Sequence, residues 1–435
     1  MSEQRDLERR VVITGAGVVS PIGVGLEEFW NSLATGRSGI GRVELLPASP
    51  MPGRIAGEVR GFEASKFTRT KEQKKSLKVM CRDIQLGVVS AWLALEDLGL
   101  KEGLVDPERL GVEFGANLMF SPPVELSRPC FASIDPTAGK FDFHRWGTHG
   151  MGDLEPLWLL KYLPNMPACH IGIFADARGP NNSLTHDDAA GGLVIGEAAR
   201  VVARGHADVM ITGSTGTRLH PVKSIHAVQW DQLAHDAADP ATVCRPFDRE
   251  RSGQVVSEAA CTIILEEEQH AAARGAKVYG RILGSGGSCV IDRDGKPDLR
   301  RALALAMKRA LDDARLQPGD VGHINAHATG EVDGDRLEAE AIHDVFGPIA
   351  SRVPVTALKS FFGNSGSGNG VLELTASLLG LQRGVVPPTL NYTQPDPTCA
   401  LNVVHGEPLP VSNRVVLKTS VTRQGQASAV VACGV

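Results

Sequence analysis

The chain has 435 residues, of which 42% are hydrophobic and 22% charged, and its formal net charge is −5. This composition is typical of an α/β protein with a large core, and the acidic balance argues against nucleic acid or anionic membranes as partners. No stretch reaches the roughly 20 apolar residues that a membrane span requires. Because the N-terminus is charged and the eight cysteines form no CxxC pair, we expect a cytoplasmic protein with reduced thiols.

The first predicted element is a buried strand near the N-terminus. Residues 9–20 (RRVVITGAGVVS) indicate a strand that passes into a glycine-rich turn at Gly15 and Gly17. The spacing of the following glycines does not match a dinucleotide-binding fingerprint, so no nucleotide cofactor is expected. Apolar periodicity then predicts a helix that ends near Gly99, and residues 110–115 form the next strand.

A long excursion rich in proline, glycine and aromatic residues follows over residues 116–168. Most of it, residues 118–152, shows neither helical nor strand periodicity, which predicts a long functional loop or cap. His144 and His149 lie within it, but they lack a third ligand at useful spacing. The sequence therefore predicts no metal site.

The second half of the chain again alternates helices and strands. Residues 300–314 and 337–346 have the pattern of helices, and residues 322–327 between them have that of a strand. Alternation in both halves favours a layered α/β architecture, with sheets sandwiched between helices. A polar helical segment separates the predicted halves, residues 9–268 and 277–435.

The most informative motif is residues 179–192, GPNNSLTHDDAAGG. It resembles the nucleophile elbow of β-ketoacyl-ACP synthases, in which a short strand after Gly-Pro-Asn ends in Ala-Cys and a buried helix begins at the cysteine. The following IGEAAR (residues 195–200) keeps the register, so Asp188 stands where that family carries its cysteine. Further matches occur in order along the chain at residues 12–17, 20–23, 163–166, 245–249, 325–329, 359–360 and 386–391.

On these motifs the chain is identified as a divergent member of the elongating ketosynthases of the thiolase superfamily. The resemblance implies the α/β class and a thiolase-like fold, with a duplicated five-layered α-β-α-β-α architecture. It also implies a dimer built around the nucleophile-bearing half, an acyl carrier protein or acyl thioester as partner, and no cofactor.

Family chemistry uses one cysteine to hold the acyl chain and two histidines to promote malonyl decarboxylation and stabilise the enolate. By resemblance the first histidine is His327, whereas Asn364 replaces the second. Lys359 and Glu338, which pair in the family, remain, and Arg423 stands where a gating phenylalanine belongs. The resemblance places five side chains at the substrate pocket: His186, Thr329, Phe362, Thr422 and Arg423.

Three readings of Asp188 follow from its chemistry. As a helix cap it would accept backbone N–H bonds, and its pKa would be lowered, which makes it a poor base. As a nucleophile it would turn a thioester into a mixed anhydride that water hydrolyses, with His327 or His186 activating the water. Malonyl decarboxylation without condensation is disfavoured, because an ionised aspartate donates no hydrogen bond and repels the malonyl carboxylate.

The family also contains chain-length factors, which lack the cysteine and pair with an active ketosynthase in a heterodimer whose acyl tunnel they help to shape. Loss of the cysteine, the second histidine and the gate together predicts a partner of this kind, inactive in condensation. The sequence leaves open whether the dimer is homomeric or heteromeric.

Overall fold

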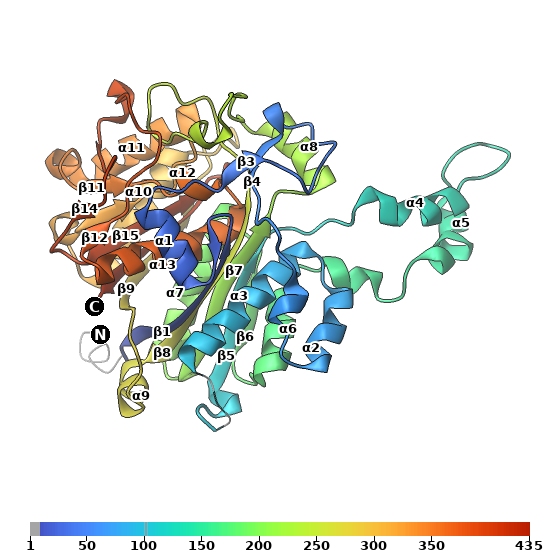
Figure 1. Ribbon diagram of the computed structural model, residues 1–435, viewed down its shortest axis with the longest axis horizontal. Coiled ribbons are helices and arrows are strands. Elements are labelled where there is room, and N and C mark those ends of the chain that lie inside the picture. Colours follow the sequence, from blue (N-terminus) through green and yellow to red (C-terminus); the bar gives the residue numbers. More distant parts are fainter. Residues whose placement is uncertain (1–8, 100, 102) are drawn as a thin grey trace.

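The computed structural model describes residues 9–99, 101 and 103–435, and one continuous mixed β-sheet forms its framework (Figure 1). A short strand, β2 (Gly23–Val24), pairs only with β1. The remaining strands of this sheet, in their spatial order, are β13 (Asn402–Val403), β11 (Pro354–Thr356), β10 (His323–Asn325), β15 (Val415–Val421), β16 (Gln426–Gly434), β9 (Gly280–Cys289), β1 (Val11–Ser20), β8 (Glu258–Glu267), β7 (Val209–Thr217), β5 (Leu110–Ala116) and β6 (Asn181–Leu184).

The two halves of the sheet repeat one topology. In the first half, β1, β8 and β7 pair antiparallel, and β7, β5 and β6 pair parallel. In the second half, β9, β16 and β15 pair antiparallel, and β15, β10 and β11 pair parallel. Antiparallel pairing of β1 with β9 joins the halves. The same order of pairings in both halves is the duplication that the resemblance implied.

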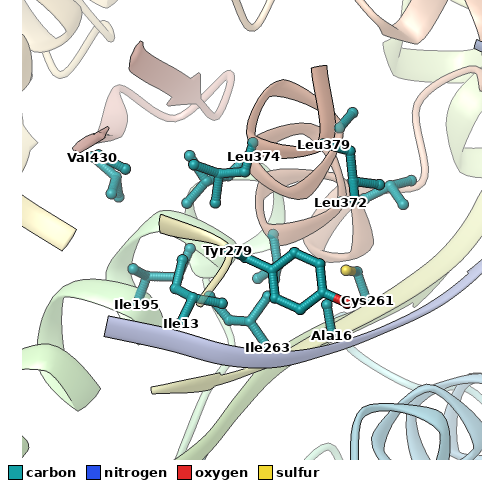
Figure 2. Packing of buried hydrophobic residues seen from close by; sticks show 14 of the residues in the cluster. Ile13, Ala16, Ile195, Cys261, Ile263, Tyr279, Leu372, Leu374, Leu379 and Val430 are labelled. Atoms are coloured by element: carbon teal, nitrogen blue, oxygen red, sulfur yellow. The ribbon is translucent and has the colours of Figure 1, made fainter. Parts of the chain in front are cut away.

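Two central helices, α7 (Ala190–Ala203) and α13 (Asn369–Gln382), lie between the halves of the sheet and contact strands of both. In Figure 2 the side chains of Leu372, Leu374 and Leu379 from α13 lie over Ile13 of β1 and Ile263 of β8. The outer faces are covered by α3 (Arg82–Leu98) and α6 (Met166–Ala175) on one side and by α10 (Leu299–Ala314) and α11 (Val332–Phe346) on the other. The predicted five-layered α-β-α-β-α architecture is therefore confirmed.

The first predicted strand is longer than expected. Gly15 and Gly17 do not form a turn, because β1 continues through both of them to Ser20. Helix α3 packs so closely on this strand that a Cβ atom at Gly17 would lie 2.1 Å from the carbonyl oxygen of Ser90. Glycine is needed here for close helix–strand packing and not for a turn. The predicted end of α3 is correct, since Gly99 caps it with a φ of 71°.

The helices and strand predicted in the second half correspond to α10, β10 and α11, although α11 begins five residues early at Val332. Helix α9 (Glu268–Ala273) lies between β8 and β9, where the topology begins to repeat. No helix in the described part of the chain is both long and apolar enough to cross a membrane. The other elements are α1 (Leu26–Ala34), β3 (Ile40–Arg42), β4 (Ile55–Gly57), α2 (Lys71–Ser76), α8 (Pro221–Trp230), α12 (Lys359–Phe362), β12 (Val385–Val386) and β14 (Leu409–Pro410).

Where the sequence predicted a long irregular loop, the structure has an arm that contains two short helices. Helices α4 (Pro123–Ala132) and α5 (Phe143–Thr148) stand away from the sheet (Figure 1). Asp142 caps α5 by accepting a hydrogen bond from the backbone N–H of His144 at 2.8 Å. Helices this short show too few turns for a hydrophobic period to be read from the sequence.

Candidate functional site

The predicted nucleophile elbow is a sharp turn between β6 and the central helix α7. Asp187 has a φ of 43°, in the left-handed region that aspartate adopts only infrequently. The next residue, Asp188, is 6% exposed and lies in a short 3₁₀ turn that leads directly into α7. The strained turn directs the side chain at position 188 into a chamber of about 530 Å³.

The structure contradicts the first of the three alternatives for Asp188, in which it caps its helix. The turn at Asp187–Ala189 has no side-chain cap, and Asp188 Oδ2 instead accepts a hydrogen bond from Arg218 Nη2 at 3.2 Å. Among the described residues, Asp188 Oδ1 has no hydrogen-bond partner. Burial, reinforced by the neighbouring Asp187 carboxylate, raises the pKa of Asp188 to about 7, whereas a cap would lower it.

Arg218 is the centre of the polar network in the chamber. Its guanidinium lies 3.5 Å from Asp187, 3.2 Å from Asp188 and 3.4 Å from Asp231, and it donates to Gln254 Oε1 at 3.3 Å. Burial opposes the charged form of Arg218, but the surrounding carboxylates outweigh it and raise the pKa of the guanidinium. Burial also raises the pKa of the Asp231 carboxyl. The chamber is therefore strongly charged and hydrogen-bonded.

His327 is held by its backbone at the wall of the chamber. Its N–H donates to Glu338 Oε1 at 2.8 Å, and its carbonyl oxygen accepts from Lys359 Nζ at 2.6 Å. The expected pairing of Lys359 with Glu338 is not formed, because Lys359 Nζ is bonded to Glu373 Oε1 at 2.9 Å. Burial first, and then the positive charges of Lys359 and Lys418, keep the pKa of His327 well below its usual value. Its imidazole is neutral at pH 7.

The Asn364 amide, which stands where the second histidine was expected, is hydrogen-bonded at both its nitrogen and its oxygen. Its Nδ2 donates to Gln254 Oε1 at 2.9 Å, and its Oδ1 accepts from the backbone N–H of Gly366 at 3.0 Å. Arg423, at the gate position, lies 3.6 Å from Asp231. The Asn364 side chain is therefore a structural link within the polar network.

The structure brings most of the predicted site residues to this chamber but not all of them. Lys359 and Glu338 lie behind His327, away from the lining. Phe362 is fully buried and packs in the core, with its ring centroid 6.4 Å from that of Phe29. The predicted residues that line the chamber are His186, Asp188, His327, Thr329, Asn364, Thr422 and Arg423.

Sequence reasoning missed many polar residues of the lining, including Arg218, Asp231, Gln254 and Glu331. One signal pointed to the first of them. Strands β6 and β7 both pair parallel with β5, so the carboxyl ends of these three strands meet at one edge of the sheet. Arg218 directly follows β7 and therefore lies at that edge. Polar residues at that edge are candidates for a site.

Among the residues that the structure describes, no cysteine contributes to the lining of the chamber. All eight cysteines have free thiols, and Cys244, Cys261 and Cys399 are buried elsewhere. Burial raises the pKa of Cys244 and of Cys261 to about 12, which keeps both in the unreactive thiol form. The chamber thus offers a carboxyl group and a neutral imidazole, but no thiolate.

Comparison with family models matches both halves of the chain. The model of the β-ketoacyl synthase N-terminal domain matches residues 8–271, and that of its C-terminal domain matches residues 279–393. A 3-oxoacyl-[acyl-carrier-protein] synthase 2 of Synechocystis sp. is 32% identical, over 92% of this chain and 92% of its own.

Two solved structures are similar over nearly the whole chain. The ishigamide ketosynthase/chain length factor superposes with a TM-score of 0.85 at 27% identity, covering 98% of this chain and 100% of that one. The second similar chain comes from the complex of a type II polyketide synthase acyl-carrier protein with its ketosynthase bound to the hexaketide. It superposes with a TM-score of 0.82 at 25% identity, covering 98% of this chain and 100% of that one.

Proposed function

The chain belongs to the β-ketoacyl synthase family of fatty acid and polyketide synthesis, and from that premise we propose that it is a non-condensing member that partners an active ketosynthase. The observation that carries this proposal is the carboxyl group of Asp188 in a chamber that no cysteine lines. Condensation requires an acyl group held as a stable thioester, and a carboxylate forms only an anhydride that water destroys.

The rest of the chamber supports the loss of condensation. Asn364 cannot replace a histidine as a base, and both polar ends of its amide are already bonded. The Arg423 guanidinium lies against Asp231 at the gate position, where the family carries an apolar side chain. A lining with several carboxylates also repels the malonyl group that a condensing enzyme must bind.

We propose that the partner is a ketosynthase of the same pathway and that this chain acts as its chain-length factor. A chain-length factor occurs among the similar structures, and an acyl-carrier protein is bound to its ketosynthase in another. Strand β6 is the last strand of the sheet and is half-exposed, which leaves one edge open for pairing with a second subunit. The free thiols are in keeping with the cytoplasmic location predicted from the sequence.

The test is co-expression with a ketosynthase from the same genome, followed by size-exclusion chromatography and incubation with a radiolabelled acyl thioester. We expect a heterodimer in which the label appears only on the ketosynthase, because this chain offers no thiolate in the chamber. The isolated chain should carry no stable label. Stable labelling of this chain, or a homodimer that ignores every such partner, would contradict the proposal.

One observation favours a second candidate function, the hydrolysis of acyl thioesters. With a pKa of about 7, Asp188 is ionised in a large fraction of molecules at neutral pH, as a base or nucleophile must be. Its carboxylate would attack the thioester carbonyl and expel the thiolate, which takes a proton from solvent. Water, deprotonated by the neutral imidazole of His327, would then cleave the anhydride and release the free acid and Asp188.

A panel of acyl-carrier-protein and coenzyme A thioesters separates the two candidates by the release of free thiol. We expect no turnover by the wild type. If the chain is a hydrolase, its rate will rise as the pH passes through about 7, because Asp188 must lose its proton. Asp188→Asn and His327→Ala will then both abolish it. Turnover that survives in Asp188→Asn would exclude the carboxylate mechanism.

A further inference from the structure

The chamber beside Asp188 has more acidic than basic side chains facing its space. Two charged residues of the lining are balanced by groups outside it: Lys223 lies 3.2 Å from Asp83, and Asp335 lies 3.8 Å from Arg251. The charged groups that remain are four carboxylates and two guanidinium groups, those of Asp187, Asp188, Asp231, Glu331, Arg218 and Arg423. When all four carboxylates are ionised, the balance of charge is negative.

One of these carboxylates has an unused acceptor. The side chain of Asp188 is 8% exposed, and its Oδ1 has no hydrogen-bond partner among the described residues. A buried carboxylate oxygen without a partner costs free energy that a donor would recover. Oδ1 itself has less than 1 Å² of accessible surface, so a rotation of the Asp188 carboxyl group, which belongs to the lining of the chamber, would bring it to an N–H donor of a ligand.

The mouth of the chamber already binds a cation from the chain itself. The guanidinium of Arg423 lies 5.2 Å from the centre of the Trp230 ring and 3.6 Å from Asp231 Oδ1. His226 packs on the same tryptophan at 4.5 Å, and Phe120 contacts His226 edge-on at 5.8 Å. An aromatic face beside a carboxylate is a recognised means of binding organic cations.

We propose that the chamber binds a small organic cation, a primary amine or a guanidine on a short apolar chain. Asp231 and Trp230 receive the cationic head at the mouth, Asp188 accepts a hydrogen bond deeper in the chamber, and the apolar chain lies against Phe120 and Val421. The negative excess excludes anionic ligands of the same size. The inference does not depend on whether the chain pairs with a ketosynthase.

Four probes with the same five-carbon chain test the charge preference by isothermal titration at pH 8. These are cadaverine, 5-amino-1-pentanol, 1,5-pentanediol and glutarate. We expect both amines to bind at least about tenfold more tightly than the diol, with dissociation constants below about 1 mM, and glutarate not to bind. Equal affinity for amine and diol, preference for glutarate, or no binding by any probe would overturn the proposal.

Three variants locate the binding site. Asp231→Asn should weaken cadaverine binding about tenfold by removing the charge at the mouth. Arg423→Ala should strengthen it by about threefold or more, because it frees Trp230 and Asp231 from the internal cation. Asp333→Asn, which alters an 82% exposed carboxylate paired with Arg336 outside the chamber, is the matched control and should change nothing.

The Arg423 side chain is half-exposed, so its replacement leaves the fold intact and keeps the test valid if Asp231→Asn unfolds. Weaker amine binding by Arg423→Ala would overturn the proposal, since it would show that Arg423 does not compete with the ligand. A loss of cadaverine binding in Asp333→Asn would also overturn the proposal, because it would place the bound cation outside the chamber.

Discussion

Replacing Glu373 with glutamine is expected to lower the free energy of unfolding by about 3–5 kcal/mol at pH 7. Glu373 is fully buried, and its carboxylate lies 2.9 Å from Lys359 Nζ and 2.8 Å from Lys418 Nζ. Glutamine keeps the shape of the side chain but leaves two buried ammonium groups without a negative partner. Urea unfolding followed by circular dichroism measures the loss.

Lys418→Met is the matched control for this result. This substitution removes one of the two cations and leaves Lys359 paired with Glu373. It should therefore lower the free energy of unfolding clearly less than Glu373→Gln does. Burial already lowers the pKa of Lys418, so raising the pH toward 10 removes its charge. The loss of stability in Glu373→Gln should therefore become smaller as the pH rises. If the two variants are equally destabilised, packing and not charge accounts for the loss.

Asp188→Asn is expected to raise the free energy of unfolding at pH 8 by about 4 kcal/mol and to change it little at pH 4. Folding raises the pKa of Asp188 from 3.8 to about 7, so the folded chain binds the proton more tightly. The wild type therefore loses stability as the pH rises from about 4 to 7, because the unfolded state ionises first. Asparagine does not ionise and avoids this loss.

Urea unfolding midpoints at the two pH values measure this difference. In the variant Arg218 keeps the carboxylates of Asp187 and Asp231 at 3.5 and 3.4 Å, so its charge stays compensated. The exposed Asp333→Asn should shift the midpoint little at either pH. An Asp188→Asn variant that unfolds at a lower urea concentration than the wild type at pH 8 would show that ionised Asp188 stabilises the fold.

Most of the fold could be predicted from sequence because its elements carry long apolar patterns. Helices α3 and α10 repeat their hydrophobic residues over several turns, and the C-terminal end of α3 and both ends of α10 were predicted to within a few residues. The helices of the arm, α4 and α5, were missed because they are too short to show a repeating hydrophobic pattern. The glycines of β1 were misread because glycine favours turns and close packing alike, and only the position of α3 distinguishes the two.

The sequence by itself determined the family, the duplicated fold and the replacement of the cysteine by Asp188, because each can be read from short motifs in their order along the chain. The tertiary structure alone decided how Asp188 behaves, since its ion-pair partner, Arg218, is 30 residues away, just after β7. It also decided that Lys359 pairs with Glu373 and not with Glu338. A pKa and an ion pair depend first on burial and on distances through space, which neighbours along the chain do not determine.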